Sequence, residues 1–232
     1  MTFEEKVAMA NTMRSRSRVG PVSPEELAVL PGTEKELWIE VADGRKVHLF
    51  EERPDALPEH APELGIDPQK ILLAGHSAGG NLVAAALIKD AEIHRLHPCC
   101  ALLEYFPVDN TVDPIDRLSP ELRADPFWVK RAQTEKLYTD FYVGDADPAD
   151  PLCSPLKADE TALAAFPDCL ILSAGEDSLR NDTEAFALRL IKAGICVTAQ
   201  RIPEAMHGFT TNRTPGWERA LEAHCKFFRQ HL

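Results

Sequence analysis

The alternation of hydrophobic and polar positions changes its period near residue 70. Before that point, polarity alternates over residues 36–41 and 46–50 around Asp43-Gly44, which predicts a β-hairpin over residues 36–51. After it, short apolar runs alternate with segments of helical periodicity. Strands are expected at 70–75, 99–105, 169–174 and 195–201, and helices at 79–90, 182–193 and 216–230. This order predicts an α/β fold, in which a mostly parallel sheet is flanked by helices.

Two further segments fall outside this alternation. Apolar residues at helical spacing predict a short amphipathic helix over residues 3–17, within an N-terminal helix or cap segment at 1–35. A long insertion at 107–160, rich in proline and aromatic residues, separates the strands on either side of it. An insertion of this length is typical of a lid or substrate-binding element, and a solvated loop with its own small core is the alternative. All residues from 1 to 232 are expected to form a single domain.

Composition and charge exclude several classes of protein. A hydrophobic content of 44% and a charged content of 27% are those of an ordinary soluble protein, and the net charge of -12 argues against nucleic acid and membrane surfaces as partners. No apolar stretch of about 18 residues occurs, and the first residues do not resemble a secretion signal. Six cysteines without C-x-x-C spacing predict reduced, buried thiols in a cytoplasmic protein. Neither a metal site nor a cofactor is expected.

The pentad Gly75-His76-Ser77-Ala78-Gly79 carries the clearest chemical signal. It follows the apolar run at 71–74 and precedes a helical pattern, which is the strand–turn–helix setting of a nucleophile elbow. The tight turn would project the Ser77 hydroxyl away from the sheet. Glycines on both sides, Gly75 and Gly79, are expected because the strand and helix backbones pass too closely for a Cβ. An ordinary strand–helix connection is the alternative reading of the same residues.

A serine nucleophile needs a histidine base and a carboxylate that orients the base. Around a nucleophile elbow, the acid and then the histidine follow on loops after later strands of the sheet. The strand after the insertion ends just before Asp177, and the next strand leads to His207. Asp177 is the preferred acid. Glu176 and Asp182 are alternatives, and Asp182 is better placed to cap the helix that follows.

The chain resembles the hormone-sensitive-lipase-like branch of the α/β-hydrolases, which contains many bacterial acetyl esterases and short-chain carboxylesterases. The matching segments are Gly65-Ile66-Asp67-Pro68, Gly75 to Leu82, Asp150 to Leu156, Asp177 to Asp182, and His207-Gly208-Phe209. The resemblance implies an α/β-hydrolase fold with Ser77 as nucleophile, Asp177 as orienting acid and His207 as general base. It also implies that the insertion at 107–160 contributes to a cap over the acyl pocket.

One part of the family pattern is missing. The His-Gly-Gly-Gly loop that supplies two of the family's oxyanion donors does not occur in this sequence, so that the Ala78 amide is the one secure donor. The hairpin leads through residues 53–59 almost directly to the segment before the elbow strand. This implies a hydrolase fold truncated by the loss of two central strands. Losing one oxyanion donor typically lowers turnover about 100- to 1,000-fold.

Such a deletion would leave the apolar strand at 70–75 without its usual neighbours. Three arrangements satisfy the pattern: an exposed edge, pairing with the hairpin, or coverage by a second copy in a homo-oligomer. The expected function is a serine carboxylic-ester hydrolase acting on small acyl esters. One alternative is a catalytically impaired or inactive hydrolase-fold protein with a binding or assembly role. Another is a peptidase or thioesterase, which would share the same three residues.

Overall fold

The structure is a computed structural model that describes residues 2, 4–5, 7–8, 67, 70–94 and 97–232, together with the backbone of 33–40 and 46–53. The chain divides into two compact units, Met1–Pro68 and Gln69–Leu232. Of the helix expected at 3–17, residues 4–5 and 7–8 are helical, and the others lie outside the described residues. The link at 20–32 and most of the junction at 53–59 also lie outside them.

The first unit contains an antiparallel hairpin. β1 (Thr33–Glu40) pairs with β2 (Lys46–Arg53) in a register that places Leu37 opposite Leu49. Both strands continue into polar residues beyond the range that the alternating pattern indicated. They can do so because main-chain hydrogen bonds form whatever the polarity of the side chains.

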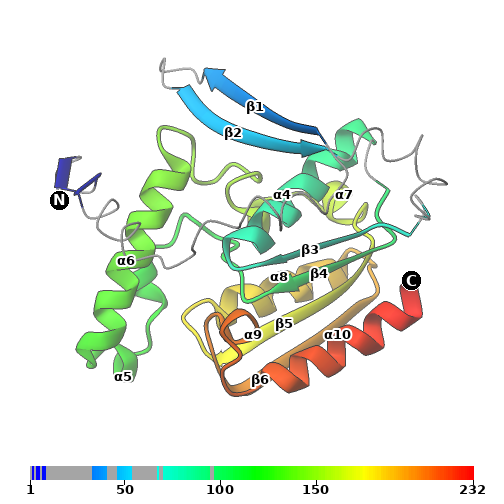
Figure 1. Cartoon of the computed structure of the whole chain (residues 1–232). Coiled ribbons are helices and arrows are strands. Elements are labelled where there is room, and N and C mark those ends of the chain that lie inside the picture. Colours follow the sequence, from blue (N-terminus) through cyan, green and yellow to red (C-terminus); the bar gives the residue numbers. More distant parts are fainter. Residues whose placement is uncertain are drawn as a thin grey trace. The chain divides into compact units, whose positions relative to one another are not determined.

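The second unit is built on a sheet of four parallel strands in the order β3-β4-β5-β6 (Figure 1). The strands are β3 (Leu72–His76), β4 (Cys100–Glu104), β5 (Asp168–Glu176) and β6 (Val197–Met206). The expected parallel sheet flanked by helices is therefore confirmed. β6 continues beyond its expected end and includes Pro203, which lies at the register shift between β5 and the edge strand β6, a position where a sheet tolerates proline. The expected loss of two central strands stays a prediction.

Helices cover both faces of this sheet. α4 (Ala78–Ile93) and α8 (Arg180–Lys192) pack on one face, and α10 (Trp217–His231) packs on the other (Figure 1). α4 connects β3 to β4 and α8 connects β5 to β6, as parallel strands require, and α10 follows the last strand. The carboxyl ends of all four strands therefore meet at one edge of the sheet.

The burial of β4 on both faces of the sheet explains why its sequence is an almost continuous apolar run. Every residue of β4 is buried. Ala101 and Leu103 belong to the apolar cluster under α4 and α8, whereas Cys100 and Leu102 belong to the cluster under α10. A strand that is covered on both faces has no solvent side on which polar residues would be favoured.

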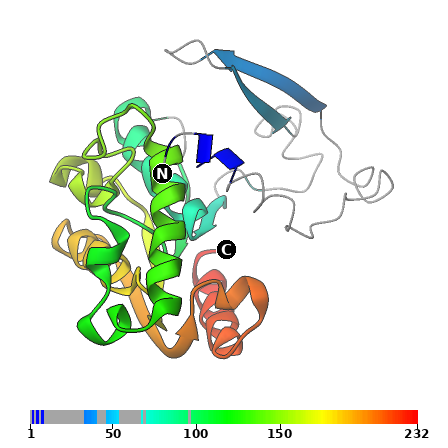
Figure 2. The same ribbon diagram turned by 90° about the vertical axis from the view of Figure 1, so that its left-hand side faces the viewer.

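The insertion at 107–160 contains a long helix that the sequence pattern did not indicate. α6 (Pro126–Val143) begins after Asp125, whose carboxylate accepts a hydrogen bond from the Phe127 N–H, and Pro126 occupies its first turn. α6 lies beyond the carboxyl ends of the strands (Figures 1 and 2). The shorter helices of this region are η1 (Pro114–Arg117), α5 (Pro120–Arg123), η2 (Pro155–Lys157) and α7 (Glu160–Leu163).

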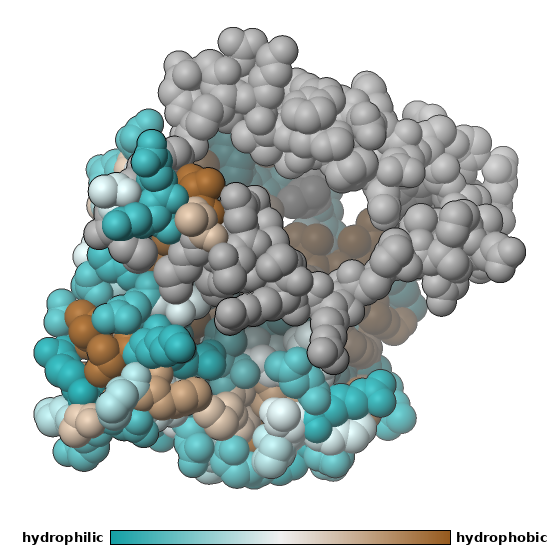
Figure 3. Space-filling view, turned by 60° about the vertical axis from the view of Figure 1, so that its left-hand side comes forward, coloured by the Kyte–Doolittle hydropathy of each residue, from teal (hydrophilic) through white to brown (hydrophobic). Residues whose placement is uncertain are grey.

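The partial exposure of α6 explains why the hydrophobic periodicity of its sequence is weak. It buries Ala132 and Leu137, while several of its aromatic residues are exposed, so the apolar positions form no single stripe. The exposed aromatic residues are Phe127, Tyr138, Phe141 and Tyr142. On the described part of the face in Figure 3, apolar residues gather in small patches between hydrophilic ones. None of the described helices is long and apolar enough to cross a membrane.

The cysteines are less buried than the sequence indicated. All six carry free thiols. Cys100 and Cys169 are buried in the sheet, and burial raises the pKa of Cys169 to about 12. The expectation of burial is wrong for Cys196 and Cys225, which are exposed. Cys196 stands just before the edge strand β6, and Cys225 lies at an exposed position of α10 between His224 and Lys226.

A buried ion pair fastens the insertion to α8. Arg117 Nε lies 3.2 Å from Asp182 Oδ2, with side-chain exposures of 5% and 15%. The expectation that Asp182 caps α8 is wrong: Leu179 is the N-cap residue, and Asp182 lies in the first turn. Burial raises the pKa of Asp182 above its usual value, and the nearby Arg117 charge opposes this rise.

Replacing Arg117 by methionine should leave the Asp182 carboxylate buried without its counter-charge. We expect Arg117→Met to lower the free energy of unfolding at neutral pH by about 3–5 kcal/mol. Because the folded-state pKa of Asp182 is raised, this group favours folding at low pH and opposes it as pH rises through that pKa. The loss should therefore shrink on acidification. Urea unfolding at several pH values measures both effects.

The matched control is Arg219→Met, which removes an ion pair between the exposed side chains of Arg219 and Glu204. An exposed pair contributes about 0–1 kcal/mol, so this variant should unfold almost like the wild type. Equal losses in the two variants, or a loss at Arg117 that does not depend on pH, would contradict the assignment of a buried pair.

Candidate active site

Ser77 occupies a strained turn between β3 and α4. Its backbone angles are φ 52° and ψ -127°, a left-handed conformation that residues other than glycine rarely adopt. The Ser77 N–H donates to the Glu104 carbonyl oxygen at 3.0 Å. The Ser77 carbonyl oxygen accepts hydrogen bonds from the N–H groups of Gly80 and Asn81. These backbone contacts hold the strained turn in place.

Two glycines make this turn sterically possible, and one of them was not the expected one. A Cβ at Gly75 would lie 2.3 Å from the Gly79 carbonyl oxygen, so strand and helix do pass too closely there. At Gly79 the expectation is wrong, because an added Cβ meets nothing within 4 Å. The second crowded position is Gly80, whose Cβ would lie 2.6 Å from that of Phe106. Gly80 is buried, and its close neighbour Phe106 lies in the loop after β4.

His207 follows directly after β6. Its Nε2 lies 2.8 Å from Ser77 Oγ, and its side chain is 21% exposed. Gly208 has a φ of 79°, which turns the chain into the short helix α9 (Phe209–Asn212). The turn therefore presents the imidazole towards the end of β3, where Ser77 lies.

Asp177 follows directly after β5 and is buried. Its Oδ2 lies 2.8 Å from His207 Nδ1, and its Oδ1 accepts the Leu179 N–H at 3.2 Å. Gly175 makes this approach possible, since a Cβ there would lie 2.2 Å from the Pro203 carbonyl oxygen. The close contact between β5 and β6 thus brings the acid and the base together.

The three carboxylates considered from sequence have different surroundings. Asp177 contacts the imidazole, Glu176 is exposed, and Asp182 pairs with Arg117. Ala78 is the first residue of α4. The first N–H groups of a helix have no acceptor within the helix, and the helix dipole adds positive potential at this end. The Ala78 amide therefore has the character that an oxyanion donor requires.

A carboxylate from α6 contacts the loop that carries Asp177. The Ser178 hydroxyl lies 3.0 Å from both carboxylate oxygens of Glu135, and Arg131 Nε lies 3.3 Å from Glu135 Oε1. The insertion thus fixes the loop from the side of the strand ends. Sequence reasoning missed Glu135, because nothing in the local pattern of α6 distinguishes it from other surface acids.

The hydrogen-bond directions in the cluster follow from its chemistry. A carboxylate can only accept, so His207 Nδ1 carries the proton that is donated to Asp177. The neutral imidazole then has its acceptor at Nε2, where the Ser77 hydroxyl donates. An arrangement of this kind can withdraw the serine proton during attack on a carbonyl carbon.

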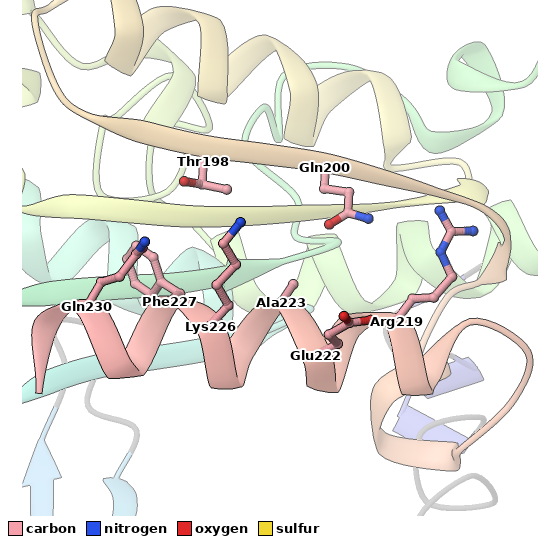
Figure 4. A pocket seen from close by; sticks show the side chains of 8 residues that line it. All are labelled: Thr198, Gln200, Arg219, Glu222, Ala223, Lys226, Phe227 and Gln230. Carbon is pink, nitrogen blue, oxygen red and sulfur yellow. The ribbon is translucent and has the colours of Figure 1, made fainter.

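A cavity of about 500 Å³ lies beside the acid loop. It is lined by Asp177 and its neighbours and by residues of the insertion, among them Arg117, Leu118, Leu122 and Trp128. A second cavity of about 400 Å³ lies between β6 and α10 (Figure 4). Its lining includes Arg219, Glu222 and Lys226, and none of the three clustered side chains. Of these two cavities, the one beside Asp177 shares a residue with the cluster, and neither Ser77 nor His207 lines it.

Comparison with known proteins gives consistent findings. A family described by the alpha/beta hydrolase fold matches residues 51–211, more than half of the chain. The carboxylic ester hydrolase LipN of Mycobacterium tuberculosis is 32% identical over 155 residues, which cover 65% of this chain and 40% of LipN. An acetyl-hydrolase of Streptomyces hygroscopicus is 30% identical over 172 residues, which cover 72% of this chain and 54% of that protein.

The structural comparison points in the same direction. An esterase of Pyrobaculum calidifontis is similar with a TM-score of 0.63 and 26% sequence identity, covering 75% of this chain and 57% of that one. The chain spans about half the length of the curated relatives described above.

Alanine at the two glycines of the pentad should have opposite consequences. We expect Gly75→Ala to lower the free energy of unfolding by at least about 1–3 kcal/mol, because its Cβ would overlap the Gly79 carbonyl oxygen. Gly79→Ala should be neutral or stabilising by up to about 1 kcal/mol, since Gly79 lies in a helix where the Cβ has space. Urea unfolding compares the two. A Gly79 variant as unstable as the Gly75 variant would show that the turn is crowded on both sides.

Proposed function

Because the chain belongs to the α/β-hydrolase family, in its hormone-sensitive-lipase-like branch, we propose that it is a serine carboxylic-ester hydrolase acting on small acyl esters. Ser77 is the nucleophile, His207 the general base and Asp177 the acid that orients it. The observation that carries this proposal is the unbroken row of two 2.8 Å hydrogen bonds from Ser77 through His207 to Asp177. The similarity to a carboxylic ester hydrolase and an acetyl-hydrolase supports the reaction class.

In the first half of the reaction, Ser77 Oγ attacks the acyl carbon of the ester while its proton moves to His207 Nε2. The imidazolium is stabilised by the Asp177 carboxylate, which lies 2.8 Å from Nδ1. The negative charge that develops on the carbonyl oxygen is stabilised by the Ala78 amide at the start of α4. When the carbon–oxygen bond to the alcohol breaks, Nε2 returns its proton to the leaving alcohol.

In the second half, water hydrolyses the acyl-enzyme. His207 Nε2 takes a proton from the water as its oxygen attacks the acyl carbon, and the bond to Ser77 Oγ then breaks. The serine oxygen takes the proton back and the carboxylic acid leaves, so that the enzyme regains its starting state. No metal or cofactor enters this sequence of steps.

The cavity beside Asp177 has the size of a small-molecule site and touches the cluster through Asp177, while Ser77 and His207 do not line it. Its volume of about 500 Å³ lies within the range of pockets that hold small molecules. Leu118, Leu122 and Trp128 give it an apolar side, which suits a short acyl or alcohol group. These three residues come from the insertion at 107–160, which in this proposal acts as the cap over the substrate.

A catalytically inert role for the same fold is the second candidate. The observation that favours it is the absence of a His-Gly-Gly-Gly run from the sequence, which leaves Ala78 as the one secure oxyanion donor. Each missing donor lowers turnover by about 100- to 1,000-fold in enzymes of this type. A protein of this kind would keep the Ser77–His207 contact and use its surface for binding or assembly.

Hydrolysis of p-nitrophenyl acetate tests the proposal. We expect Ser77→Ala and His207→Gln each to lower kcat/KM at least about 1,000-fold, because nucleophile and base act as a unit. The matched control is His97→Gln at an exposed histidine, which should leave kcat/KM unchanged. Equal hydrolysis by the wild type and the Ser77→Ala variant would remove Ser77 from the reaction.

A fluorophosphonate probe separates the two candidates. The esterase proposal predicts rapid labelling of one residue per chain, identified as Ser77 by mass spectrometry and abolished in the Ser77→Ala variant. Wild-type protein that neither hydrolyses the ester faster than Ser77→Ala nor reacts with the probe would favour the inert role.

A further inference from the structure

Behind His207 lies a buried carboxylate that the proposed reaction does not use. Glu104 is the last residue of β4 and is 4% exposed. Its Oε2 lies 3.0 Å from the Thr210 hydroxyl, and its Oε1 lies 2.8 Å from His224 Nε2 on α10. A buried carboxylate is costly unless its oxygens accept hydrogen bonds, and here both oxygens have a partner.

These contacts form a chain of hydrogen bonds in which the order of donors and acceptors is fixed. The Glu104 carboxylate can only accept, so it accepts one hydrogen bond from the Thr210 hydroxyl and one from the Nε2–H of His224. The Thr210 oxygen is then an acceptor for the Tyr105 hydroxyl, which lies 2.5 Å away. Burial raises the pKa of Tyr105 above its ordinary value, so its phenol keeps the proton that it donates. The donors therefore run from Tyr105 to Thr210 and from Thr210 to Glu104.

Tyr105 places an aromatic ring against the imidazole of His207. The two ring centroids are 5.2 Å apart, with planes inclined at 70° in an edge-to-face contact. The Tyr105 side chain is fully buried, and its backbone φ is 33°. For a bulky residue this is a strained conformation, which persists only where neighbouring contacts hold it. The contact of its hydroxyl with Thr210 is one of those constraints.

The same network reaches both turns of the candidate site. The Glu104 carbonyl oxygen accepts the Ser77 N–H at 3.0 Å, on the side of the nucleophile. Its carboxylate holds Thr210, in the first turn after His207, on the side of the base. Ser77 and Asp177 already occupy the two imidazole nitrogens, so the position of the ring depends on this turn and on the packing of Tyr105.

We propose that Glu104, Thr210 and Tyr105 are positioning residues that hold the imidazole of His207 in register with Ser77. The proposal rests on the proposed function, in which His207 is the general base. None of the three side chains touches the reacting atoms. They act through the backbone turn after His207 and through the aromatic contact of Tyr105 with its ring, and His224 on α10 completes the hydrogen bonds of the carboxylate.

Thr210→Val is the most direct test, because valine keeps the shape of threonine and removes the hydroxyl between Tyr105 and Glu104. We expect kcat to fall by about 10- to 100-fold with little change in KM, since a displacement of about 1 Å at a reacting group can cost that much. Thr210→Ser restores the hydroxyl and should recover most of kcat. The matched control is Thr214→Val at an exposed threonine in the same segment, which should leave kcat unchanged; Thr211 is unsuitable because its hydroxyl lies 3.4 Å from that of Tyr105.

Two further measurements keep the test decisive if Thr210→Val folds poorly. Tyr105→Phe removes only the hydroxyl and keeps the ring against His207, and it should lower kcat in the same direction. Independently of turnover, the low-field NMR signal of the proton between His207 Nδ1 and Asp177 should shift or broaden in Thr210→Val and persist in Thr214→Val. This second readout requires no ester hydrolysis.

The outcomes separate this proposal from the proposed function. If Ser77→Ala abolishes hydrolysis while Thr210→Val and Tyr105→Phe keep the wild-type kcat and NMR signal, the positioning role is wrong and the esterase function stands. If wild type and Ser77→Ala hydrolyse the ester equally, the esterase function is wrong, and the NMR comparison alone decides whether Thr210 holds the imidazole.

Discussion

Parallel pairing of four strands is the constraint on which the candidate site depends. Because β3, β4, β5 and β6 run in the same direction, the turns that carry Ser77, Asp177 and His207 lie at one edge of the sheet. Pairing alone does not bring the side chains into contact. That requires the close approach of β5 to β6 at Gly175, where a side chain would overlap the Pro203 backbone. The acid and the base meet because the two strands can come this close.

Backbone strain is concentrated at the same edge. Ser77 and Tyr105 both have positive φ, and they stand directly after the paired strands β3 and β4. Such conformations persist where the surroundings determine them more strongly than the residue's own preference does. Here Glu104 contributes to both turns, through its carbonyl oxygen towards Ser77 and through its carboxylate towards Thr210. The rigidity of the proposed site therefore comes from residues that never contact a substrate.

The insertion and the nucleophile elbow have different parts in the proposed reaction. The insertion contributes Glu135 to the loop of the acid and lines the cavity beside it, which supports a role in holding a small substrate. The elbow provides the Ala78 amide at the start of α4. In the proposed reaction, the rate would depend on the electrostatic stabilisation of a developing oxyanion, which is usually the largest single contribution to catalysis of acyl transfer. In the proposed reaction, the Ser77–His207–Asp177 row would supply the proton transfer, and the oxyanion donors would set the rate that it can reach.

The sequence by itself indicated, through hydrophobic periodicity, which segments form the strands and helices of the sheet region. It also indicated that Ser77, Asp177 and His207 each follow a strand. Local pattern carries this information because helix and strand periodicity are properties of neighbouring residues. It did not indicate α6, whose apolar residues form no stripe, or the crowding at Gly80, which arises from Phe106 in the loop after β4. It also did not indicate that Asp182 pairs with Arg117, or that Glu104 meets Thr210 and His224. Only the tertiary structure decided these contacts, because each joins residues far apart in the chain and depends on distances that no local pattern encodes.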